Sequence, residues 1–247
     1  MKTKALKPSN RRDFVKLVTG GVFGGLALLN IPACSNARYI ISDDDKIDPK
    51  DEKFWKVVKE QFPIIKNMIW MNNGTMGPSP YVVQEAMFEK EINANSTGNY
   101  GGYDSVRPKL AKMIGCDKEE ISLTMNVTNG INIIAQGLKL KKGDEVILTN
   151  HEHIGNAVPW MARAKRDGIV LKFADMGKDS DEMLNKINDI ITSKTRVIAV
   201  PHQTCTQGQI LPGKEITKLG HDKGLWVMLD AAHPVGQFPV DVKDLDC

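Results

Sequence analysis

The sequence contains few cysteines, no internal repeat and no low-complexity tract. Its 247 residues include four cysteines, at Cys34, Cys116, Cys205 and Cys247. Their spacing matches no paired motif, so neither a zinc site nor a disulfide framework is indicated. With 41% hydrophobic and 26% charged residues, the composition is ordinary for a globular protein. The chain is long enough to bury a sizeable core in one domain or two small ones.

A strong excess of one charge sign is also absent. The formal net charge is +3, and residues 1–33 hold six cations and one acid. That segment accounts for +5, which leaves a net charge of −2 on the rest of the chain. A mildly acidic body is not typical of a nucleic-acid-binding protein, so no nucleic-acid partner is expected.

Residues 1–33 are predicted to be a targeting segment that is not part of the folded domain. The pair Arg11-Arg12 resembles the start of a twin-arginine export signal. The apolar stretch over residues 17–29 is short and rich in glycine, which argues against a membrane span. A small residue before Cys34 resembles a lipoprotein cleavage box, and Cys34 would then be the lipidated first residue. A plain N-terminal membrane anchor is the alternative.

These features predict export by the twin-arginine route to the periplasm or the cell envelope. Membrane contact is expected only through the signal or the lipid anchor. The resemblance implies that the protein is transported in a folded state. Residues 34–69 are predicted to be a tether and N-terminal arm, since residues 35–53 are polar and acidic.

Short apolar runs alternate with amphipathic patterns from Tyr81 onward. Helices are predicted at Tyr81–Asn95, Val106–Ile114, Thr128–Leu138, Asn156–Asp167, Ser180–Ile191 and Lys214–Lys223. Strands are predicted at Ile121–Met125, Val146–Thr149, Val170–Phe173, Val197–Val200 and Leu225–Leu229. This alternation favours an α/β fold with a mostly parallel sheet and helices on both faces.

Hydrogen-bonding or ionisable groups follow four of the five predicted strands. In open α/β sheets, ligands bind beyond the carboxyl ends of the strands. Polar loops follow strands in many proteins, but an aspartate and histidines directly after apolar runs are less ordinary. The sequence therefore predicts a ligand site formed by Asn126–Gly130, Asn150–His153, Pro201–Thr206 and Asp230–His233.

The segment Thr128-Asn129-Gly130 opens a helix directly after a predicted strand. Free backbone N–H groups and the helix dipole favour an anion there, and the threonine hydroxyl adds a donor. The alternative is an ordinary helix N-cap, which Thr128 or Asn126 would also satisfy. The segment alone does not decide between the two.

Asp230 ends a strongly apolar strand, where a carboxylate needs a partner to offset its desolvation. A protonated pyridine nitrogen is one suitable partner, because the carboxylate keeps the ring cationic and makes it an electron sink. A helix cap or a magnesium ligand would also satisfy Asp230. Position in the sequence leaves these three open.

His151 and His153 stand two residues apart, which on a strand places both on one face. A metal site is conceivable on that ground, but no third ligand occurs at a convincing spacing, and no metal is expected. An imidazole stacked on an aromatic ring is a second interpretation. A surface histidine without a ligand is the third.

Five stretches resemble, in order and in spacing, the class V aminotransferase family of pyridoxal-phosphate enzymes. The resemblance covers roughly residues 70–247 and is most similar in character to the isopenicillin N epimerase-like branch. Cysteine desulfurases share the framework. The stretches are Asn72–Pro78, Ile121–Asn132, Gly143–His153 with Pro159-Trp160, Gly208–Pro212 and Asp230–Gly236.

The resemblance implies the large domain of a pyridoxal-phosphate transferase of fold type I over residues 70–247, C-terminally incomplete. It implies that Thr128 binds the cofactor phosphate together with neighbouring backbone groups such as Asn129. It implies that His153 stacks on the pyridine ring and that Asp230 pairs with the ring nitrogen. His233 stands where family members place a glutamine or histidine near the ring hydroxyl.

Two further groups of residues take their roles from the same resemblance. One of the residues from Thr204 to Thr206 is expected beside the ring, and Thr204 is chosen. Asn73 and Gly74 are expected at the substrate entrance. The implied partners are a small amino-acid substrate and a second copy of the chain in a homodimer.

One departure from the family concerns the lysine that holds the cofactor as an imine. The family has it a short way past the Asp230 motif, and it is expected beyond Cys247. Lys243 stands in a segment that resembles the connecting stretch. The leading hypothesis is the N-terminal part of an enzyme acting on an amino acid by epimerase, transaminase or desulfurase chemistry. The alternative is a non-catalytic envelope lipoprotein that keeps the fold as a binding module.

Overall fold

The computed structural model describes residues 48, 50–65 and 67–247. The chain divides into two units, Met1–Gln61 and Phe62–Cys247. The described part of the first unit contains helix α2 (Glu52–Glu60), whose N-cap Asp51 accepts a hydrogen bond from Lys53 N. The predicted signal and the lipidation site Cys34 lie outside the described residues. Among the residues that the structure describes, no helix is both long and apolar enough to cross a membrane.

The second unit is built on a four-stranded parallel sheet, as the sequence predicts. Its strands are β1 (Glu145–Thr149), β2 (Val170–Ala174), β3 (Thr195–Pro201) and β4 (Trp226–Asp230), in the order β2-β1-β3-β4. The register pairs Thr149 with Ala174 and Pro201 with Asp230. All four strands therefore present their carboxyl ends at one edge.

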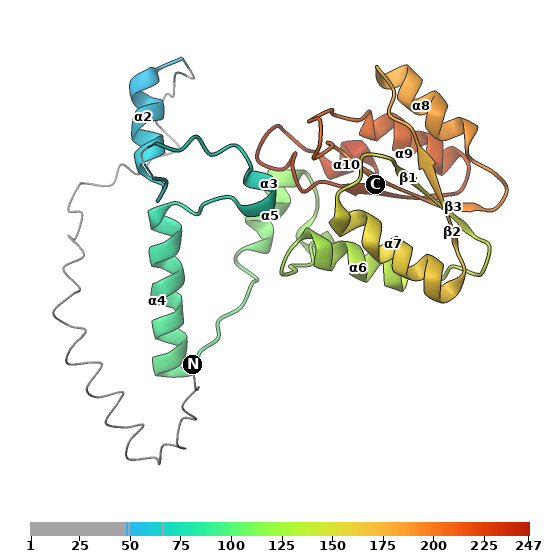
Figure 1. Ribbon diagram of the computed structural model, residues 1–247. Helices are drawn as coiled ribbons and strands as arrows, with labels where there is room; N and C mark the ends of the chain where they lie inside the picture. The colour runs from blue at the N-terminus through green and yellow to red at the C-terminus, as the bar shows by residue number, and fades with distance from the viewer. Residues whose placement is uncertain (1–47, 49, 66) are drawn as a thin grey trace, which may run out of the picture. The chain divides into compact units, whose positions relative to one another are not determined.

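Helices cover both faces of this sheet, as predicted (Figure 1). Helices α6 and α7 lie on one side, and α8 and α9 lie on the other. Each predicted helix is found, with ends that differ by about two residues or fewer, the usual uncertainty of a helix boundary. The bounds are α6 (Val127–Gly137), α7 (Ile154–Asp167), α8 (Ser180–Asp189), α9 (Gly213–Asp222) and α10 (Val242–Leu245).

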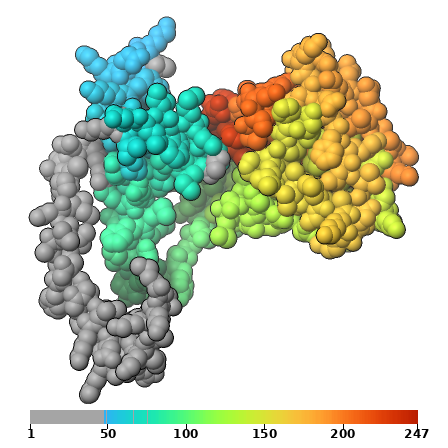
Figure 2. All heavy atoms as spheres, in the orientation of Figure 1, coloured from blue at the N-terminus to red at the C-terminus, as the bar shows by residue number. Residues whose placement is uncertain are grey.

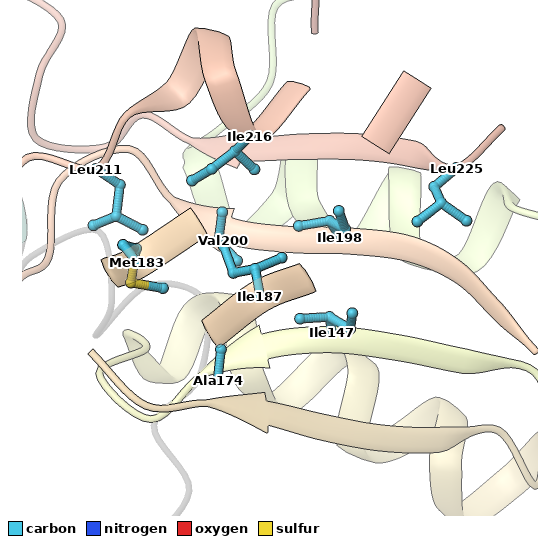
Figure 3. Close-up of a cluster of buried hydrophobic side chains, with 9 residues drawn as sticks. All are labelled: Ile147, Ala174, Met183, Ile187, Ile198, Val200, Leu211, Ile216 and Leu225. Carbon is cyan, nitrogen blue, oxygen red and sulfur yellow. The ribbon is translucent and has the colours of Figure 1, made fainter. Parts of the chain in front are cut away.

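The core consists of two apolar clusters separated by the sheet. Because successive strand residues point to opposite faces, Ile147 and Ile198 belong to one cluster and Val146 and Val197 to the other. The first cluster packs against α8 and α9 and is drawn in Figure 3. The second includes Trp160 of α7, which is fully buried. In the space-filling view, the side chains from α6 to α9 form one continuous surface (Figure 2).

Three further helices of the second unit precede α6 in the chain. They are α3 (Asn73–Met76), α4 (Tyr81–Thr97) and α5 (Arg107–Ile114). Helices α4 and α5 end at Gly98 and Gly115, both in the left-handed conformation that glycine adopts without strain.

The predicted strand Ile121–Met125 is wrong. A short 3₁₀ helix (Lys118–Glu120) leads into a segment with no strand pairing in the described chain, and Met125 is exposed. An apolar run becomes a strand only where a neighbouring strand accepts its backbone hydrogen bonds. This segment instead leads directly into the N-cap of α6.

Candidate active site at the carboxyl edge of the sheet

A pocket lies where the loops after β1, β3 and β4 meet. Its walls include His153 from the first loop, Gln203 and Cys205 from the second, and Asp230 and His233 from the third. The remaining lining residues are Gly74, Pro201 and Ala232. Four residues singled out from the sequence, His153, Asp230, His233 and Gly74, are thus brought together around one hollow.

Asp230 is the last residue of β4 and is 6% exposed. Its Oδ1 atom accepts a hydrogen bond of 3.0 Å from the backbone N–H of Ala232. Its backbone oxygen accepts from the N–H of His202, which ties the end of β4 to the end of β3. The carboxylate is therefore held in place by its own loop and lines the pocket, where it can meet a cationic group.

His153 is the N-cap of α7, and its ring is exposed. Its Nδ1 atom accepts a hydrogen bond of 3.0 Å from Gly155 N, so the neutral ring carries its proton on Nε2. The cap fixes the position of the imidazole at the pocket wall while leaving the ring accessible. Such a ring can stack on a planar ligand.

The turn that carries His153 is anchored by the neighbouring carboxylate of Glu152. Glu152 Oε1 accepts from the backbone N–H and the hydroxyl of Thr149, at 2.9 and 2.8 Å. Its Oε2 accepts from Asn156 Nδ2 at 2.8 Å. Burial raises the pKa of Glu152, and the charge of Asp230 raises it further, against these hydrogen bonds. Glu152 lies within the predicted site segment Asn150–His153, but the sequence does not show these hydrogen bonds.

Thr128 and Asn129 stand in the first turn of α6. Asn126 is the N-cap, and its side chain accepts from Asn129 N at 2.9 Å, so the capping interpretation is correct for Asn126. The first backbone N–H groups of a helix have no partner inside the helix, so those of Val127 and Thr128 are available to an anion. Capping and anion binding are therefore compatible at this helix end.

Gly155 brings the start of α6 against the start of α7. A β-carbon at Gly155 would be 2.5 Å from Thr128 Oγ1 and 2.9 Å from His153 Nδ1. Only glycine fits between these two side chains. Thr128, the candidate phosphate-binding residue, and His153, the candidate stacking residue, are thus neighbours. A ligand that carries both a phosphate and a ring requires this arrangement.

Gly74 makes a second close approach, to another residue that lines the pocket. A β-carbon at Gly74 would be 2.1 Å from Cε1 of His233. Asn73, the other predicted substrate residue, begins helix α3 and is exposed. The segment before α4 therefore reaches the carboxyl edge through Gly74, although it is far from His233 in the sequence.

Thr204 is buried at 1% exposure and does not line the pocket. Its hydroxyl accepts from Gln209 N at 3.1 Å, within the turn that follows β3. The residues on either side of it, Gln203 and Cys205, line the pocket instead. Both lie within the predicted site segment Pro201–Thr206, but Thr204 is the residue predicted beside the ring.

His151 lies outside this pocket lining and contacts Thr206 through Nδ1 and Oγ1 at 2.7 Å. Across residues 48, 50–65 and 67–247, no group of three or more histidine, cysteine or acidic side chains is placed to hold a metal ion. No lysine is among the residues that line the pocket. Lys243 is in α10, and its Nζ atom contacts Asp117 Oδ2 at 2.8 Å.

Pyridoxal phosphate is suited to the groups present at this edge. The enclosed part of the pocket measures about 30 Å³, the share of one water molecule in liquid water. A cofactor would therefore lie over the hollow, against the exposed ring of His153. The buried Asp230 carboxylate matches a cationic ring, and the first turn of α6 matches a phosphate.

Comparison with known proteins agrees with this chemistry. The parallel sheet with helices on both faces and a polar carboxyl edge is that of pyridoxal-phosphate enzymes of fold type I, as predicted. The sequence profile of the family described as aminotransferase class V matches residues 83–247. The chain belongs to the aminotransferase class V family. The comparisons support pyridoxal phosphate as the cofactor.

The curated relatives that the chain matches include proteins described as probable cysteine desulfurases. One from Synechocystis sp. is 31% identical over 210 residues, covering 77% of this chain and 50% of the relative. One from Methanothermobacter thermautotrophicus is 35% identical over 200 residues, covering 75% of this chain and 49% of the relative. The chain thus spans about half the length of these relatives.

Solved structures of the same fold give a similar result. A mutant of C-DES with glycine covalently linked to its pyridoxal-phosphate cofactor matches with a TM-score of 0.68 and 28% identity, covering 76% of this chain and 53% of that one. The apo structure of a cysteine desulfurase from Thermococcus onnurineus matches with a TM-score of 0.66 and 28% identity, covering 77% and 50%.

Proposed function

We propose that this chain holds pyridoxal phosphate at the carboxyl edge of its sheet and that the complete protein uses it to act on an amino acid. The observation that carries the proposal is the convergence of His153, Asp230 and His233 on one pocket, with Thr128 beside His153. No single loop supplies these groups. Their meeting explains why ionisable residues occur at the ends of β1 and β4.

Each residue has a physical task in this proposal. The first turn of α6, with the Thr128 hydroxyl, binds the phosphate through donors and the helix dipole. His153 covers one face of the ring, and Asp230 keeps the ring nitrogen protonated. When bound, the cofactor supplies an electron sink for bonds broken at the substrate α-carbon. Asn73 and Gly74 border the entrance by which the amino acid arrives.

For the reaction itself, we propose cleavage of a carbon–sulfur bond in a cysteine-like amino acid. The proposal is supported by the relatives described as probable cysteine desulfurases and by a structure of C-DES described as a cystine C–S lyase. Epimerase chemistry of the isopenicillin N epimerase-like branch is the second candidate, and it depends on the motifs around Asn72–Pro78 and Gly208–Pro212. Nothing in the comparisons favours a non-catalytic binding module.

We further propose that two copies associate and that the protein is exported. The homodimer is what the resemblance to the class V aminotransferase family implies. Export and lipidation at Cys34 are supported by the sequence alone, through Arg11-Arg12 and the small residue before that cysteine.

Cofactor binding tests the central proposal directly. The purified chain should bind pyridoxal phosphate saturably, with one cofactor per chain and an induced circular-dichroism signal in the cofactor absorption band. Pyridoxal, which lacks the phosphate, should bind much more weakly. Absence of saturable binding, or equal affinity for the two compounds, would overturn the proposal. For the reaction, the complete protein should release sulfur from cysteine rather than racemise alanine.

A further inference from the structure

The amino edge of the sheet, opposite the pocket, carries exposed lysines ahead of every strand. One lysine precedes each of β2, β3 and β4, and three precede β1. These amino-edge lysines are Lys165, Lys194, Lys223, Lys139, Lys141 and Lys142. None of their ammonium groups forms an ion pair or a hydrogen bond with another described residue. Their charges are therefore available to a partner outside the chain.

The acidic side chains beside these lysines are paired with other cations. The pairs are Asp144–Arg196, Glu145–Lys172, Asp167–Arg166 and Asp222–Lys218. Asp189, at the end of α8, is the one acid of this edge without a cationic partner among the described residues. The amino edge is thus locally positive, although residues 34–247 together carry a net charge of −2.

Helix ends account for only two of the six lysines. The C-terminal end of a helix attracts cations, but this effect falls off within the last turn. Lys165 is in the last turn of α7, and Lys223 is the C-cap of α9. The other four lie past the ends of α6 and α8. Stabilisation of the helices therefore does not explain why these four positions are lysine.

Backbone contacts hold the lysine-bearing connections side by side. Gly143 N donates to Gly168 O at 2.9 Å, and Glu145 N donates to Lys194 O at 2.9 Å. Neighbouring strands are about 4.8 Å apart, so the four connections span about 15 Å. Neighbouring connections are thus closer than the screening length of about 8 Å at physiological salt. Their lysines can act together on one charged surface.

We propose that the amino edge of the sheet binds an anionic phospholipid surface. A row of lysines spread over four connections matches a layer of phosphate headgroups, whereas a single small anion would need donors that converge on one point. The predicted lipidation at Cys34 would tether the chain beside a bilayer. A basic patch adds an electrostatic contact to such an anchor. This contact is additional to the one expected through the signal or the lipid.

The direction of the strands keeps the pocket accessible in this arrangement. Strand β1 has five residues and a parallel strand rises about 3.3 Å per residue, so the two edges are about 17 Å apart. The pocket that contains Asp230 lies at the carboxyl edge. A membrane in contact with the amino edge would therefore leave the pocket open to the aqueous phase.

Lysine footprinting tests which edge meets the membrane. The purified full chain is mixed with vesicles of equal parts phosphatidylglycerol and phosphatidylcholine, or of phosphatidylcholine alone, and acetylation of each lysine is followed by peptide mass spectrometry. With about nine-tenths of the chain bound to the anionic vesicles, acetylation of the amino-edge lysines should slow by up to about tenfold. Neutral vesicles should not slow it. The internal controls, which should keep their rates, are the exposed Lys90, Lys109, Lys112 and Lys178. Equal protection of the two sets, or none at the amino edge, would overturn the inference.

Two variants with the same loss of charge test the affinity. The first carries Lys139→Gln, Lys141→Gln, Lys142→Gln and Lys194→Gln, and the second carries glutamine at the four control lysines. Binding to the anionic vesicles, measured by co-sedimentation, should weaken at least about tenfold in the first variant and less than about threefold in the second. The first should also unfold in urea like the unsubstituted chain, because its substituted ammonium groups have no partners among the described residues.

Equal vesicle affinity in the two variants would overturn the inference. Tighter binding of the unsubstituted chain to duplex DNA than to the anionic vesicles would also overturn it, because the edge would then belong to a nucleic-acid partner. Both results would leave the proposed function standing, since the amino-edge lysines take no part in cofactor binding.

Discussion

The hydroxyl of Thr128 and the imidazole of His153 meet across the α-carbon of Gly155. A β-carbon at that position would be 2.5 Å from Thr128 Oγ1 and 2.9 Å from His153 Nδ1. Gly155 also donates its N–H to His153 Nδ1. One glycine therefore sets the spacing between the helix end that suits a phosphate and the ring that suits stacking.

Replacing this glycine should damage cofactor binding without unfolding the protein. Gly155→Ala pushes Thr128 and His153 apart, and we expect the Kd for pyridoxal phosphate to rise about tenfold, or about 1.4 kcal/mol. Gly137→Ala is the control, because a β-carbon at Gly137 meets nothing within 4 Å. Both variants are measured by titration of the induced circular-dichroism signal. Unchanged affinity in Gly155→Ala would mean that the cofactor does not use this pair.

Asp230→Asn should separate cofactor binding from chemistry. The amide keeps the shape of the side chain and can still accept from Ala232 N, but it no longer stabilises a protonated ring nitrogen. In the complete protein, turnover should fall by about a hundredfold or more, while the Kd for pyridoxal phosphate changes by about tenfold or less. Turnover equal to that of the unsubstituted protein would remove Asp230 from the ring-nitrogen role.

Much of the fold was accessible from the sequence because local patterns and global structure agree. The strand Glu145–Thr149 is buried along its whole length, and its apolar run indicated this. Ile121–Met125 has a similar run of apolar residues but no pairing partner, and a pattern alone does not show whether a partner exists. The parallel order of the strands followed from the helices between them.

The site could be predicted from the sequence only in part. Asp230 ends β4 and His153 lies in the loop after β1, so topology alone brings them to one edge. Thr204 was chosen over its neighbours because the sequence does not show the hydrogen bonds by which Gln209 engages it. The approach of Gly74 to His233 depends on how a distant segment packs, and no local pattern encodes it.

Glu152 is expected to stabilise the turn that carries His153. Glu152→Ala removes the acceptor for Thr149 and one acceptor for Asn156, and should lower the free energy of unfolding by about 1–3 kcal/mol. The measurement is urea unfolding at neutral pH. Glu91→Ala, at an exposed position of α4, is the control and should change stability by about 0.5 kcal/mol or less. If Glu152→Ala loses no more stability than Glu91→Ala, Glu152 does not anchor the turn.

The same carboxylate predicts a pH dependence. Burial raises the pKa of Glu152 above its ordinary value of 4.5, so the unfolded chain loses this proton first as pH rises. The contribution of Glu152 to stability therefore falls as pH increases from 4.5 to the folded pKa. Glu152→Gln does not titrate, so it should lack this fall in unfolding experiments across that range. If the free energy of unfolding varies with pH in the same way in both proteins, the pKa of Glu152 is not raised by folding.

Export is tested by the arginine pair. Changing Arg11 and Arg12 together to lysine keeps the charge but removes the feature that resembles the twin-arginine signal. The precursor should then stay in the cytoplasmic fraction, as seen by immunoblotting of cell fractions. Cys34→Ser should leave export intact but abolish labelling by a radioactive fatty acid. Normal export of the lysine variant would exclude the twin-arginine route.

His202 is a buried imidazole at the end of β3 that the proposed reaction does not use. It is 6% exposed, and its ring meets that of Phe238 edge to face, with centroids 5.6 Å apart. Its Nδ1 atom has no hydrogen-bond partner among the described residues. Burial lowers the pKa of His202 below its ordinary value of 6.5, so the folded protein favours the neutral ring.

The sign of the effect on stability follows from proton binding. As pH falls below 6.5, the unfolded chain takes up a proton at this residue before the folded chain does. The free energy of unfolding therefore decreases as pH drops from 6.5 toward the folded pKa. His202→Phe keeps an aromatic ring against Phe238 but cannot titrate, so it should lose less stability over this window. Urea unfolding at about pH 8 is the reference, because the imidazole is neutral in both states there. If the two proteins lose stability equally between about pH 6.5 and pH 5, the folded protein accepts a proton at His202 as readily as the unfolded chain, and its burial has no such consequence.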